Sequence, residues 1–591
     1  DWPKPEHLEP VDVPLIDLKP ADLHLREDAL ARLSSVKQLP PLTAQQPFGV
    51  FILTFEGDRL PIGAIRRVVD GVVRRKRTRG RGGTAVWDLD DLVFFCRTGD
   101  GGGSIHVVAF REQDGKRTLR AISWSTDLSP QKLELLANDA LPALIWPPDG
   151  GLDVDAWRAG WRDAFRTSYR QGVRSAEKLA EIMADTAREV RDGIRDLIEL
   201  ETDDGPLQRI FTQVRANLRE DLDEAAFADM YAQTMVYGLL TARITHPEDF
   251  SGATTRLTFE NPFLDALYTT FRGEAGDTVD IDEFGLLDLA ELLGRTDVDA
   301  ILAEFGAKDP RNDPVIYFYE EFLERYDADK RKELGTYYTP VPVVHWIVDA
   351  VDHILREQLG FPDGIADGTT WQEYAARTGA VAPEGVDPTA PVIRALDPAT
   401  GTGTFLLEWI RQSVGDATGV ERQRRLRDAL ARVDAFEIDL PGYTVAHLKA
   451  SLELPAELRA SVTPSIVLTD TLAGRRELLL REQDVIAEEG ARAEHLKFSQ
   501  HHNVVIGNPP YRMMSQAAGG GMITELINGR RLFDDVFETA NANTKFSHLA
   551  HLYNLYVYFW RWATWKGFEQ NESGPAVVAF ITASAWLTGP G

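Results

Sequence analysis

Residues 396–405 read LDPATGTGTF and decide how the C-terminal half of the chain folds. The apolar run Val392–Leu396 precedes this stretch and the apolar-periodic run Phe405–Val414 follows it. This order predicts a short strand, a glycine-rich turn and a helix. Gly401 and Gly403 would let the backbone approach a ligand closely, and the helix N-terminus favours negative charge. A dinucleotide-binding fingerprint needs a third glycine that this chain lacks, so the turn does not match that pattern.

Further short apolar runs alternate with helical stretches after this turn. They predict an α/β domain with a doubly wound, Rossmann-like sheet. The expected strands are Val433–Ile438, Ser465–Leu468, Asn503–Ile506 and Ala576–Ile581. The segment Phe361–Pro391 is rich in Gly, Ala and Pro, and we expect an inserted loop there. Ligands of such sheets bind outside the carboxyl ends of the strands, so residues that follow each strand are the candidates for a site.

The strongest local motif is NPPY at residues 508–511, directly after an apolar strand. Asn508 offers a side-chain carbonyl acceptor, and the two prolines fix φ and lack an N–H, so that backbone carbonyls project outward. These acceptors suit both hydrogens of an exocyclic amine, and Tyr511 can stack on a planar base. A plain turn is the alternative, because Asn-Pro often initiates turns.

Acidic residues follow the next two expected strands. Glu437 can bind ribose hydroxyls, although its distance in sequence from Asp397 exceeds the usual ~20 residues and predicts an insertion. Asp470 lies in the run LTDTL, and residues 335–340 read GTYYTP just before the α/β region. Each motif alone could be incidental. Five of them in this order, at strand ends or loops of one sheet, indicate a single ligand site.

Together the motifs resemble those of amino-group (N6-adenine) DNA methyltransferases of the γ motif order, in which a Thr-Pro motif precedes the DPxxGTG loop and NPPY follows. Residues 313–320 (DPVIYFYE) and 332–340 (KELGTYYTP) are similar to methyltransferases of single-polypeptide type I-like restriction enzymes and of phage-defence systems such as DISARM and BREX. The resemblance covers about residues 310–591. We expect the family's last strands and its target-recognition domain to be absent.

The resemblance implies a role for each motif. The implied cofactor is S-adenosylmethionine, and the implied reaction transfers its methyl group to N6 of an adenine flipped out of double-stranded DNA. The residues implied to bind the cofactor are Tyr338, Thr339 and Pro340 at its methionine end, Asp397, Pro398, Gly401, Gly403 and Phe405 in and beside the loop, Glu437 at the ribose, and Asp470, Thr471 and Leu472 at the adenine. The residues implied to hold the target adenine, as the catalytic set, are Asn508, Pro509, Pro510 and Tyr511.

Two domains are expected before the sheet, which gives boundaries at 1–150, 151–330 and 331–591. The first is a small α/β domain with antiparallel strands, preceded by an extended lead-in with a short helix near Arg26–Ser35. Its strands are expected at Phe48–Phe55, Val86–Cys96, Ser104–Phe110 and Leu119–Ser123, with a helix at Ile62–Val73. The second is an all-helical connector, with helices expected at Trp157–Leu200, Leu207–Leu222, Asp223–Leu240, Asn261–Arg272 and Ile281–Phe305.

The net charge of the 591-residue chain is −28, from 92 acidic and 64 basic residues, which is the wrong sign for general polyanion binding. Basic residues clustered along the phosphates would still permit DNA binding. The candidate DNA-binding strip consists of Arg74, Arg75, Lys76, Arg77, Arg79 and Arg81. A solvated helix face and loop is the alternative.

The single cysteine, Cys96, excludes a disulfide within the chain and multi-cysteine metal sites, and its position outside the sheet argues against cytosine-C5 chemistry.

Other activities find little support in the sequence. There is no P-loop and no His/Cys metal spacing, and the carboxylates and lysine at 112–116 indicate a hairpin turn rather than a nuclease remnant. No apolar run is long enough for a transmembrane helix, and we expect a cytoplasmic protein. Two alternatives stay open. One is a methyltransferase for glutamine amides or RNA guanines. The other is a DNA-sensing subunit that needs an effector, motor or specificity subunit as partner.

Overall fold

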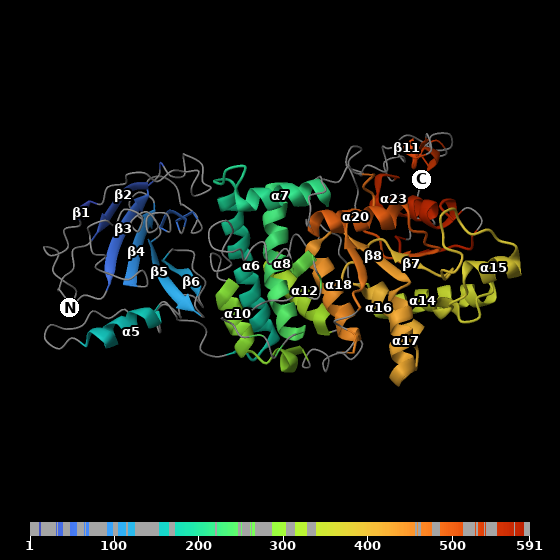
Figure 1. The fold of residues 1–591 in the computed structure, drawn as a ribbon, viewed down its shortest axis with the longest axis horizontal. Coiled ribbons are helices and arrows are strands. Elements are labelled where there is room, and N and C mark those ends of the chain that lie inside the picture. The colour runs from blue at the N-terminus through green and yellow to red at the C-terminus, as the bar shows by residue number, and fades with distance from the viewer. Residues whose placement is uncertain are drawn as a thin grey trace. The chain divides into compact units, whose positions relative to one another are not determined.

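The structure is a computed structural model that describes part of the chain. The described residues are 11–12, 31, 33–38, 48–55, 64–65, 67–69, 91–98, 105–113, 116–124, 153–164, 172–218, 222–245, 247, 250, 261, 263–265, 286–302, 314–327, 339–455, 458, 462–475, 485–511, 526–527, 530–536, 538, 552–571 and 574–583. The chain divides into two compact units (Figure 1). The first comprises Asp1–Thr212, Asp223–Leu257 and Leu267–Ile301, and the second comprises Gln213–Leu222, Thr258–Ala266 and Leu302–Gly591.

The first unit begins with a six-stranded sheet in the order β1-β2-β3-β4-β5-β6. The strands are β1 (Val11–Asp12), β2 (Leu33–Gln38), β3 (Gly49–Phe55), β4 (Leu92–Thr98), β5 (Ile105–Gln113) and β6 (Lys116–Trp124). Neighbouring strands are antiparallel except β3 and β4, which are parallel. The expected antiparallel strands are confirmed except at this parallel pair. A parallel pair needs a crossover, and the described residues 64–65 and 67–69 between these strands are helical, as expected there.

Two other expectations for the first unit hold in part. The short helix expected near Arg26–Ser35 is confirmed at Ala31, but Leu33–Ser35 belong to β2, whose pairing with β3 overrides the local helical preference. The predicted helix Trp157–Leu200 is interrupted at residues 172–175. Ser175 caps the second part by accepting a hydrogen bond from the Lys178 N–H at 3.2 Å. A Cβ at Gly172 would lie 2.0 Å from the Arg295 carbonyl oxygen, so this break brings two backbones into close contact.

The first unit also contains helices, one of which is buried on all sides. They are α5 (Val154–Ala164), α6 (Ala176–Ile198), α7 (Pro206–Asn217, which runs into the second unit), α8 (Glu224–Thr245) and α10 (Leu286–Arg295). Residues 227–242 of α8 are buried all round, and α6 and α10 pack against this helix. The predicted helix Ile281–Phe305 breaks at residues 296–297, where the Thr296 hydroxyl donates to the Leu292 carbonyl and accepts from the Val173 N–H.

The second unit contains a five-stranded parallel sheet in the order β13-β10-β7-β8-β9. The strands are β7 (Ala395–Asp397), β8 (Val433–Glu437), β9 (Ser465–Leu468), β10 (Val504–Gly507) and β13 (Val577–Phe580). The chain runs outward from β7 to β9, then returns to β10 on the other side of β7. This is a doubly wound sheet whose strand order reverses between β7 and β10. The five expected strands are confirmed.

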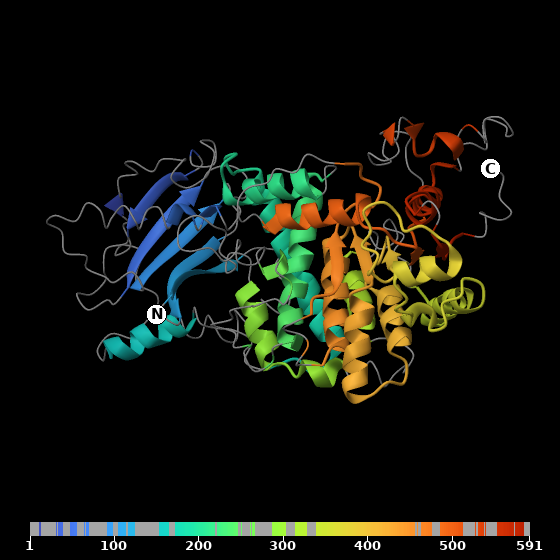
Figure 2. The same ribbon diagram turned by 45° about the vertical axis from the view of Figure 1, so that its right-hand side comes forward.

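Helices cover both faces of this sheet (Figures 1 and 2). Helices α14 (Val341–Glu357), α16 (Thr404–Val414), α17 (Gly419–Leu430) and α18 (Leu440–Glu453) lie on one side, and α20 (Val485–Phe498) and α23 (Leu555–Thr564) on the other. Helix α12 (Pro314–Tyr326) contacts α18. A short strand pair, β11 (Leu526–Ile527) and β12 (Arg530–Arg531), lies apart from the sheet. Among the described helices none is long and apolar enough to span a bilayer.

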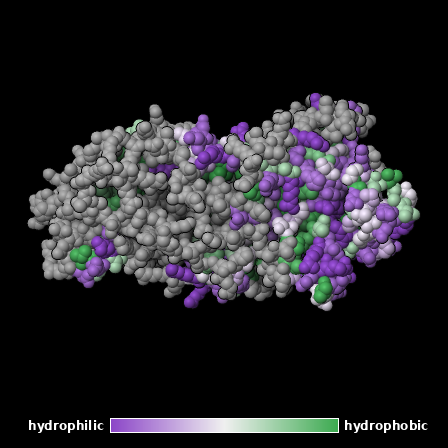
Figure 3. All heavy atoms as spheres, in the orientation of Figure 1, coloured by the Kyte–Doolittle hydropathy of each residue, from purple (hydrophilic) through white to green (hydrophobic). Residues whose placement is uncertain are grey.

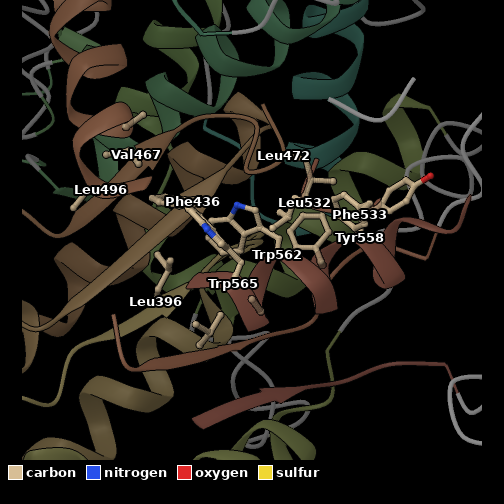
Figure 4. Close-up of a cluster of buried hydrophobic side chains, with 14 residues drawn as sticks. Leu396, Phe436, Val467, Leu472, Leu496, Leu532, Phe533, Tyr558, Trp562 and Trp565 are labelled. Carbon is tan, nitrogen blue, oxygen red and sulfur yellow. The ribbon is translucent and has the colours of Figure 1, made fainter. Parts of the chain in front are cut away.

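An aromatic cluster fills one face of the sheet (Figure 4). Phe436 from β8 meets Trp562 from α23 edge to face, with ring centroids 6.2 Å apart. Trp565 packs against Trp562, and neighbouring leucines and valines of four strands complete the cluster. The aromatic residues of α23 therefore belong to a core helix and do not form an exposed base-stacking surface.

A buried charge network holds the amino ends of the strands. The Asp434 carboxylate is fully buried and accepts from Arg394 Nε at 2.7 Å and pairs with His502 Nε2 at 2.8 Å. Nearby, the buried Lys566 ammonium, in η8 (Trp565–Glu569), donates to three backbone carbonyls at the end of α20, at 2.7 to 2.8 Å. Burial lowers the pKa of Lys566. These contacts join β7, β8, β10 and α20 at the edge opposite the strand ends discussed below.

The segment Phe361–Pro391 is not a simple loop, contrary to the expectation. It contains the 3-10 turn η6 (Gly364–Ala366) and the helix α15 (Trp371–Thr378). A capping box begins α15, because the Thr370 hydroxyl accepts from the Glu373 N–H while the Glu373 carboxylate accepts from the Thr370 N–H. The high Gly, Ala and Pro content of the segment concealed this helix.

We predict that Trp562→Ala destabilises the second unit strongly. Trp562 is 0% exposed at the centre of the aromatic cluster, and removing such a side chain costs about 3–5 kcal/mol. The free energy of unfolding is measured by chemical denaturation followed by circular dichroism. Trp346→Ala is the matched control, because Trp346 is 67% exposed. The described surface that faces the viewer in Figure 3 is mostly hydrophilic. An equal loss in both variants would contradict the prediction.

Candidate active site

Four candidate residues lie at the carboxyl ends of neighbouring strands. Asp397 ends β7 and Glu437 ends β8, while Asp470 and Asn508 follow β9 and β10 within two residues. Because all of these strands are parallel, the four residues share one edge of the sheet. The strand order reverses between β7 and β10, which is where doubly wound sheets bind their ligands.

The Glu437 carboxylate holds the glycine-rich loop in place. Its Oε2 accepts a hydrogen bond from the Gly401 N–H at 2.6 Å. Its Oε1 accepts from the backbone N–H groups of Ile438 at 3.0 Å and Asp439 at 2.8 Å. A carboxylate oxygen has two lone-pair sites, so Oε1 is saturated and one site on Oε2 is left. Glu437 in this arrangement keeps one acceptor site for a ligand.

The loop turns through two glycines with positive φ, 55° at Gly401 and 83° at Gly403. A Cβ added at Gly403 would lie 3.3 Å from the Ala446 Cβ, so this glycine lets α16 begin close against α18. A Cβ added at Gly401 would meet nothing within 4 Å. The space beside Gly401 is therefore open among the described residues, and a ligand can approach the backbone there.

Asp397 lies directly below the loop and is 1% exposed. Its Oδ1 accepts from the Ala399 N–H at 3.1 Å, while its Oδ2 is buried and the Thr400 hydroxyl lies close to the carboxylate. Gly507, at the end of β10, packs against this carboxylate. A Cβ at Gly507 would lie only 2.8 Å from Asp397 Oδ1, so no larger residue fits between the loop and the NPPY motif.

Asp470 and Thr471 form a turn that contacts the same loop from β9. The Thr471 hydroxyl donates to the Pro398 carbonyl at 2.5 Å. Asp470 Oδ1 accepts from the Leu472 N–H at 2.9 Å, and the Asp470 carbonyl accepts from the Lys497 ammonium at 2.5 Å. Leu472 is buried in the aromatic cluster, and Phe405 is likewise buried in α16.

On the other side of the strand reversal, the NPPY motif meets the Thr-Pro motif. Asn508 Nδ2 donates to the Thr339 hydroxyl at 3.1 Å, and the Tyr511 hydroxyl donates to Asn508 Oδ1 at 2.8 Å. Pro509 is buried, and Asn508 and Tyr511 are half-buried. The Tyr511 ring meets the Tyr556 ring edge to face at 6.0 Å. These contacts bring together two motifs that lie far apart in the sequence.

Burial raises the pKa values of three acidic groups at this edge of the sheet. It raises the pKa of Asp397 to about 7, although the Ala399 N–H acts in the opposite direction. It also raises the pKa of Glu437 to about 7, helped by the charge of Asp439 and opposed by the three backbone N–H groups. Burial raises the pKa of Tyr511 to about 12, so its hydroxyl stays a hydrogen-bond donor at neutral pH.

These residues fit S-adenosylmethionine on two observations. The open space at Gly401 can take a ligand beside the backbone, and Glu437 keeps one acceptor site. That acceptor suits a hydroxyl donor, which the nucleoside part of that molecule carries. Among the described residues no cluster of His, Cys, Asp and Glu is arranged to hold a metal ion.

The structure brings most of the sequence-predicted residues to one edge, but not all can be placed. Tyr338 and the strip Arg74, Arg75, Lys76, Arg77, Arg79 and Arg81 lie outside the described residues. Sequence reasoning missed Gly507 and Lys497. The sequence could have indicated Gly507, because it directly precedes NPPY. It could not have indicated Lys497, which donates a hydrogen bond to a carbonyl 27 residues away.

Comparison with known proteins gives a limited result. No family model and no curated protein matches the chain. Solved structures similar to it include the ATP-dependent type ISP restriction-modification enzyme LlaBIII bound to DNA, at 18% identity over 73% of this chain and 26% of that one, with a TM-score of 0.47. The DrdV–DNA complex is 17% identical over 93% of this chain and 46% of that one, with a TM-score of 0.46. A modification subunit of a putative type I restriction enzyme from Vibrio vulnificus is 16% identical over 60% of this chain and 64% of that one, with a TM-score of 0.27.

The chain thus spans about a quarter of the LlaBIII chain and under half of the DrdV chain. TM-scores below 0.5 at such identities do not establish a shared fold.

We predict that Gly507→Ala disturbs both halves of the site. The new methyl group must displace the Asp397 carboxylate or β10, and overpacking of this kind costs about 1–3 kcal/mol. Thermal and chemical denaturation measure the loss. Gly368→Ala is the matched control in the same unit, because a Cβ there meets nothing within 4 Å. The prediction fails if the two variants unfold alike.

We also predict that Asp397→Asn stabilises the protein above neutral pH. The pKa of Asp397 rises from an ordinary 3.8 to about 7 on folding, so the folded protein binds a proton more tightly than the unfolded chain. The free energy of unfolding therefore falls as pH rises from about 4 to 7, and the neutral amide escapes this loss. We expect a gain of about 1–3 kcal/mol at pH 8 that disappears at pH 4.

Unfolding curves at pH 4, 6 and 8 measure this gain. Asp387→Asn is the control, since hydrogen bonds from Thr389 lower the pKa of this exposed carboxyl and place its titration below the tested range. A gain for Asp397→Asn that is independent of pH would contradict the assignment of the buried charge.

Proposed function

We propose that this chain is an S-adenosylmethionine-dependent DNA methyltransferase that modifies N6 of adenine in a restriction-modification or phage-defence system. The observation that carries the proposal is the position of Asn508. It lies at the point of strand reversal, beside a glycine loop held by a carboxylate, with its amide oxygen directed at a tyrosine hydroxyl. Such an acceptor beside an aromatic ring suits the amine of a planar base.

The reaction class follows from what these residues offer. Asn508 Oδ1 accepts one hydrogen of the exocyclic amine, and the backbone carbonyl of Pro509 accepts the other. Tyr511 stacks on the base, which must leave the duplex to reach the site. Held in this way, the amine nitrogen directs its lone pair away from the acceptors. Orientation of this kind accounts for much of the rate enhancement in a direct displacement.

The cofactor half is assigned to the residues that follow β7, β8 and β9, together with the Thr-Pro motif that contacts Asn508. Thr339, Pro340 and Asp397 are proposed at the methionine end, Glu437 at a ribose hydroxyl, and Asp470 with Thr471 at the adenine. S-adenosylmethionine supplies an electrophilic methyl group when bound. No cysteine nucleophile is needed, and Cys96 is buried in β4, where burial raises the pKa of its thiol and keeps it unreactive.

DNA and protein partners form part of the same proposal. We assign duplex contact to the basic strip Arg74–Arg81 and to further subunits or domains that would supply sequence recognition, a motor or a nuclease. Two alternative functions predict different experimental results. A methyltransferase for glutamine amides or RNA guanines would label those substrates instead, and a sensor subunit would bind cofactor and DNA without turnover until its partner is added.

We predict that Asn508→Ala abolishes methylation while S-adenosylmethionine binding persists. The variant loses the amine acceptor and, with it, at least about 100-fold in rate. Purified protein is incubated with labelled cofactor and unmethylated plasmid DNA, and the labelled base is identified after digestion. Calorimetry measures cofactor binding in parallel.

Label on N6-methyladenine from the wild type, and none from the variant, is the expected result. Unchanged labelling by Asn508→Ala would refute the assignment of Asn508. Label that appears only on a peptide or an RNA would replace the DNA substrate with the first alternative. Cofactor binding without any label would favour the sensor subunit.

A further inference from the structure

The Asn508 amide is held at both ends by hydroxyl groups. Its Nδ2 donates to the Thr339 hydroxyl at 3.1 Å, and its Oδ1 accepts from the Tyr511 hydroxyl at 2.8 Å. Thr339 lies 169 residues earlier in the chain, directly before Pro340, which caps α14. Tyr511 lies three residues later, in the same motif. The side chain is thus fixed between β10 and the segment that begins α14.

The orientation of this amide decides what it can bind. Rotating the terminal amide by 180° exchanges the carbonyl oxygen, an acceptor, with the NH₂ group, a double donor. Only the first orientation accepts hydrogen from an exocyclic amine. In the second, N–H groups would face N–H groups, and the base would leave buried donors unpaired, which costs free energy on both sides.

The chemistry of the two hydroxyls favours the first orientation. The phenol of Tyr511 is far more acidic than the aliphatic hydroxyl of Thr339, so it is the better donor and selects the oxygen end of the amide. The Thr339 hydroxyl has two acceptor lone pairs and selects the NH₂ end. Oδ1 also has two lone pairs, of which Tyr511 uses one, so the second is available for a substrate amine.

We propose that Thr339 is a positioning residue that sets the orientation of the Asn508 amide for the target base. This inference rests on the proposed function and gives the Thr-Pro motif a role on the target side, beyond its expected contact with the cofactor. The hydroxyl acts through Asn508 and need not touch the substrate. Its removal leaves the amide free to rotate, and a fraction of molecules then presents donors to the amine.

The test compares Thr339→Val, which removes the hydroxyl at nearly constant shape, with Thr339→Ser, which keeps it. For Thr339→Val we expect kcat to fall about 10- to 100-fold while the Kd for S-adenosylmethionine changes less than about twofold. Thr339→Ser should restore kcat to within a few-fold of the wild type. Thr378→Val is the control, because that hydroxyl contacts only neighbouring backbone of α15, donating to the Tyr374 carbonyl and accepting from the Ala380 N–H.

Two kinetic results would overturn the inference. The first is a loss of cofactor affinity in Thr339→Val as large as its loss of kcat/KM, which would make Thr339 a cofactor residue alone. The second is a Thr339→Ser variant as slow as Thr339→Val, which would make the methyl group rather than the hydroxyl responsible.

A second readout does not depend on methylation. In the full chain labelled with ¹⁵N-asparagine, the side-chain NH₂ signal that Asn508→Asp removes belongs to Asn508. Thr339→Val should shift this signal, and Thr339→Ser should leave it near its wild-type position. If no substrate is methylated but this pattern is observed, the proposed function fails while the positioning contact stands. If Thr339→Val leaves the signal unchanged, the positioning role is overturned whatever the activity.

Discussion

The parallel pairing of β7 with β8 on one side and with β10 on the other is the constraint on which the candidate site depends. Parallel strands have all their carboxyl ends at one edge of the sheet, so the residue that follows each strand lies at that edge. The reversal of strand order at β7 then separates the crossover helices and leaves room at that edge. Asp397, Glu437 and Asn508 owe their proximity to this register and not to their spacing in the sequence.

The sheet could be predicted from the sequence because its strands are short apolar runs bounded by turn residues. Ser465–Leu468 is matched at both ends, and the other strands are matched within a few residues. The helix α15 was missed because one capping box, at Thr370 and Glu373, lies inside a segment of loop-like composition. The parallel pair β3–β4 was missed because strand direction depends on the crossover, which local pattern does not reveal.

The candidate site was likewise only partly predictable from the sequence. Residues at strand ends could be found from pattern alone, but their partners could not. The Gly401–Glu437 hydrogen bond spans 36 residues and the Thr339–Asn508 hydrogen bond spans 169, and no periodicity links such positions. The saturation of Glu437 Oε1 by two backbone N–H groups is likewise a property of the folded loop, and it changes what this carboxylate can offer a ligand.

The buried carboxylates show why this edge is suited to binding rather than to stability. Asp397 and Glu437 both resist ionisation because burial raises their pKa values, so each charge at neutral pH opposes folding. A ligand that donates hydrogen bonds to these carboxylates would stabilise their charges. That stabilisation would contribute to the free energy of binding. Gly507 lies on the other side of the strand reversal and packs against Asp397. Because a Cβ there would lie 2.8 Å from Asp397 Oδ1, this carboxylate packs directly against the end of β10. The loop and the NPPY motif are therefore coupled through packing as well as through the sheet.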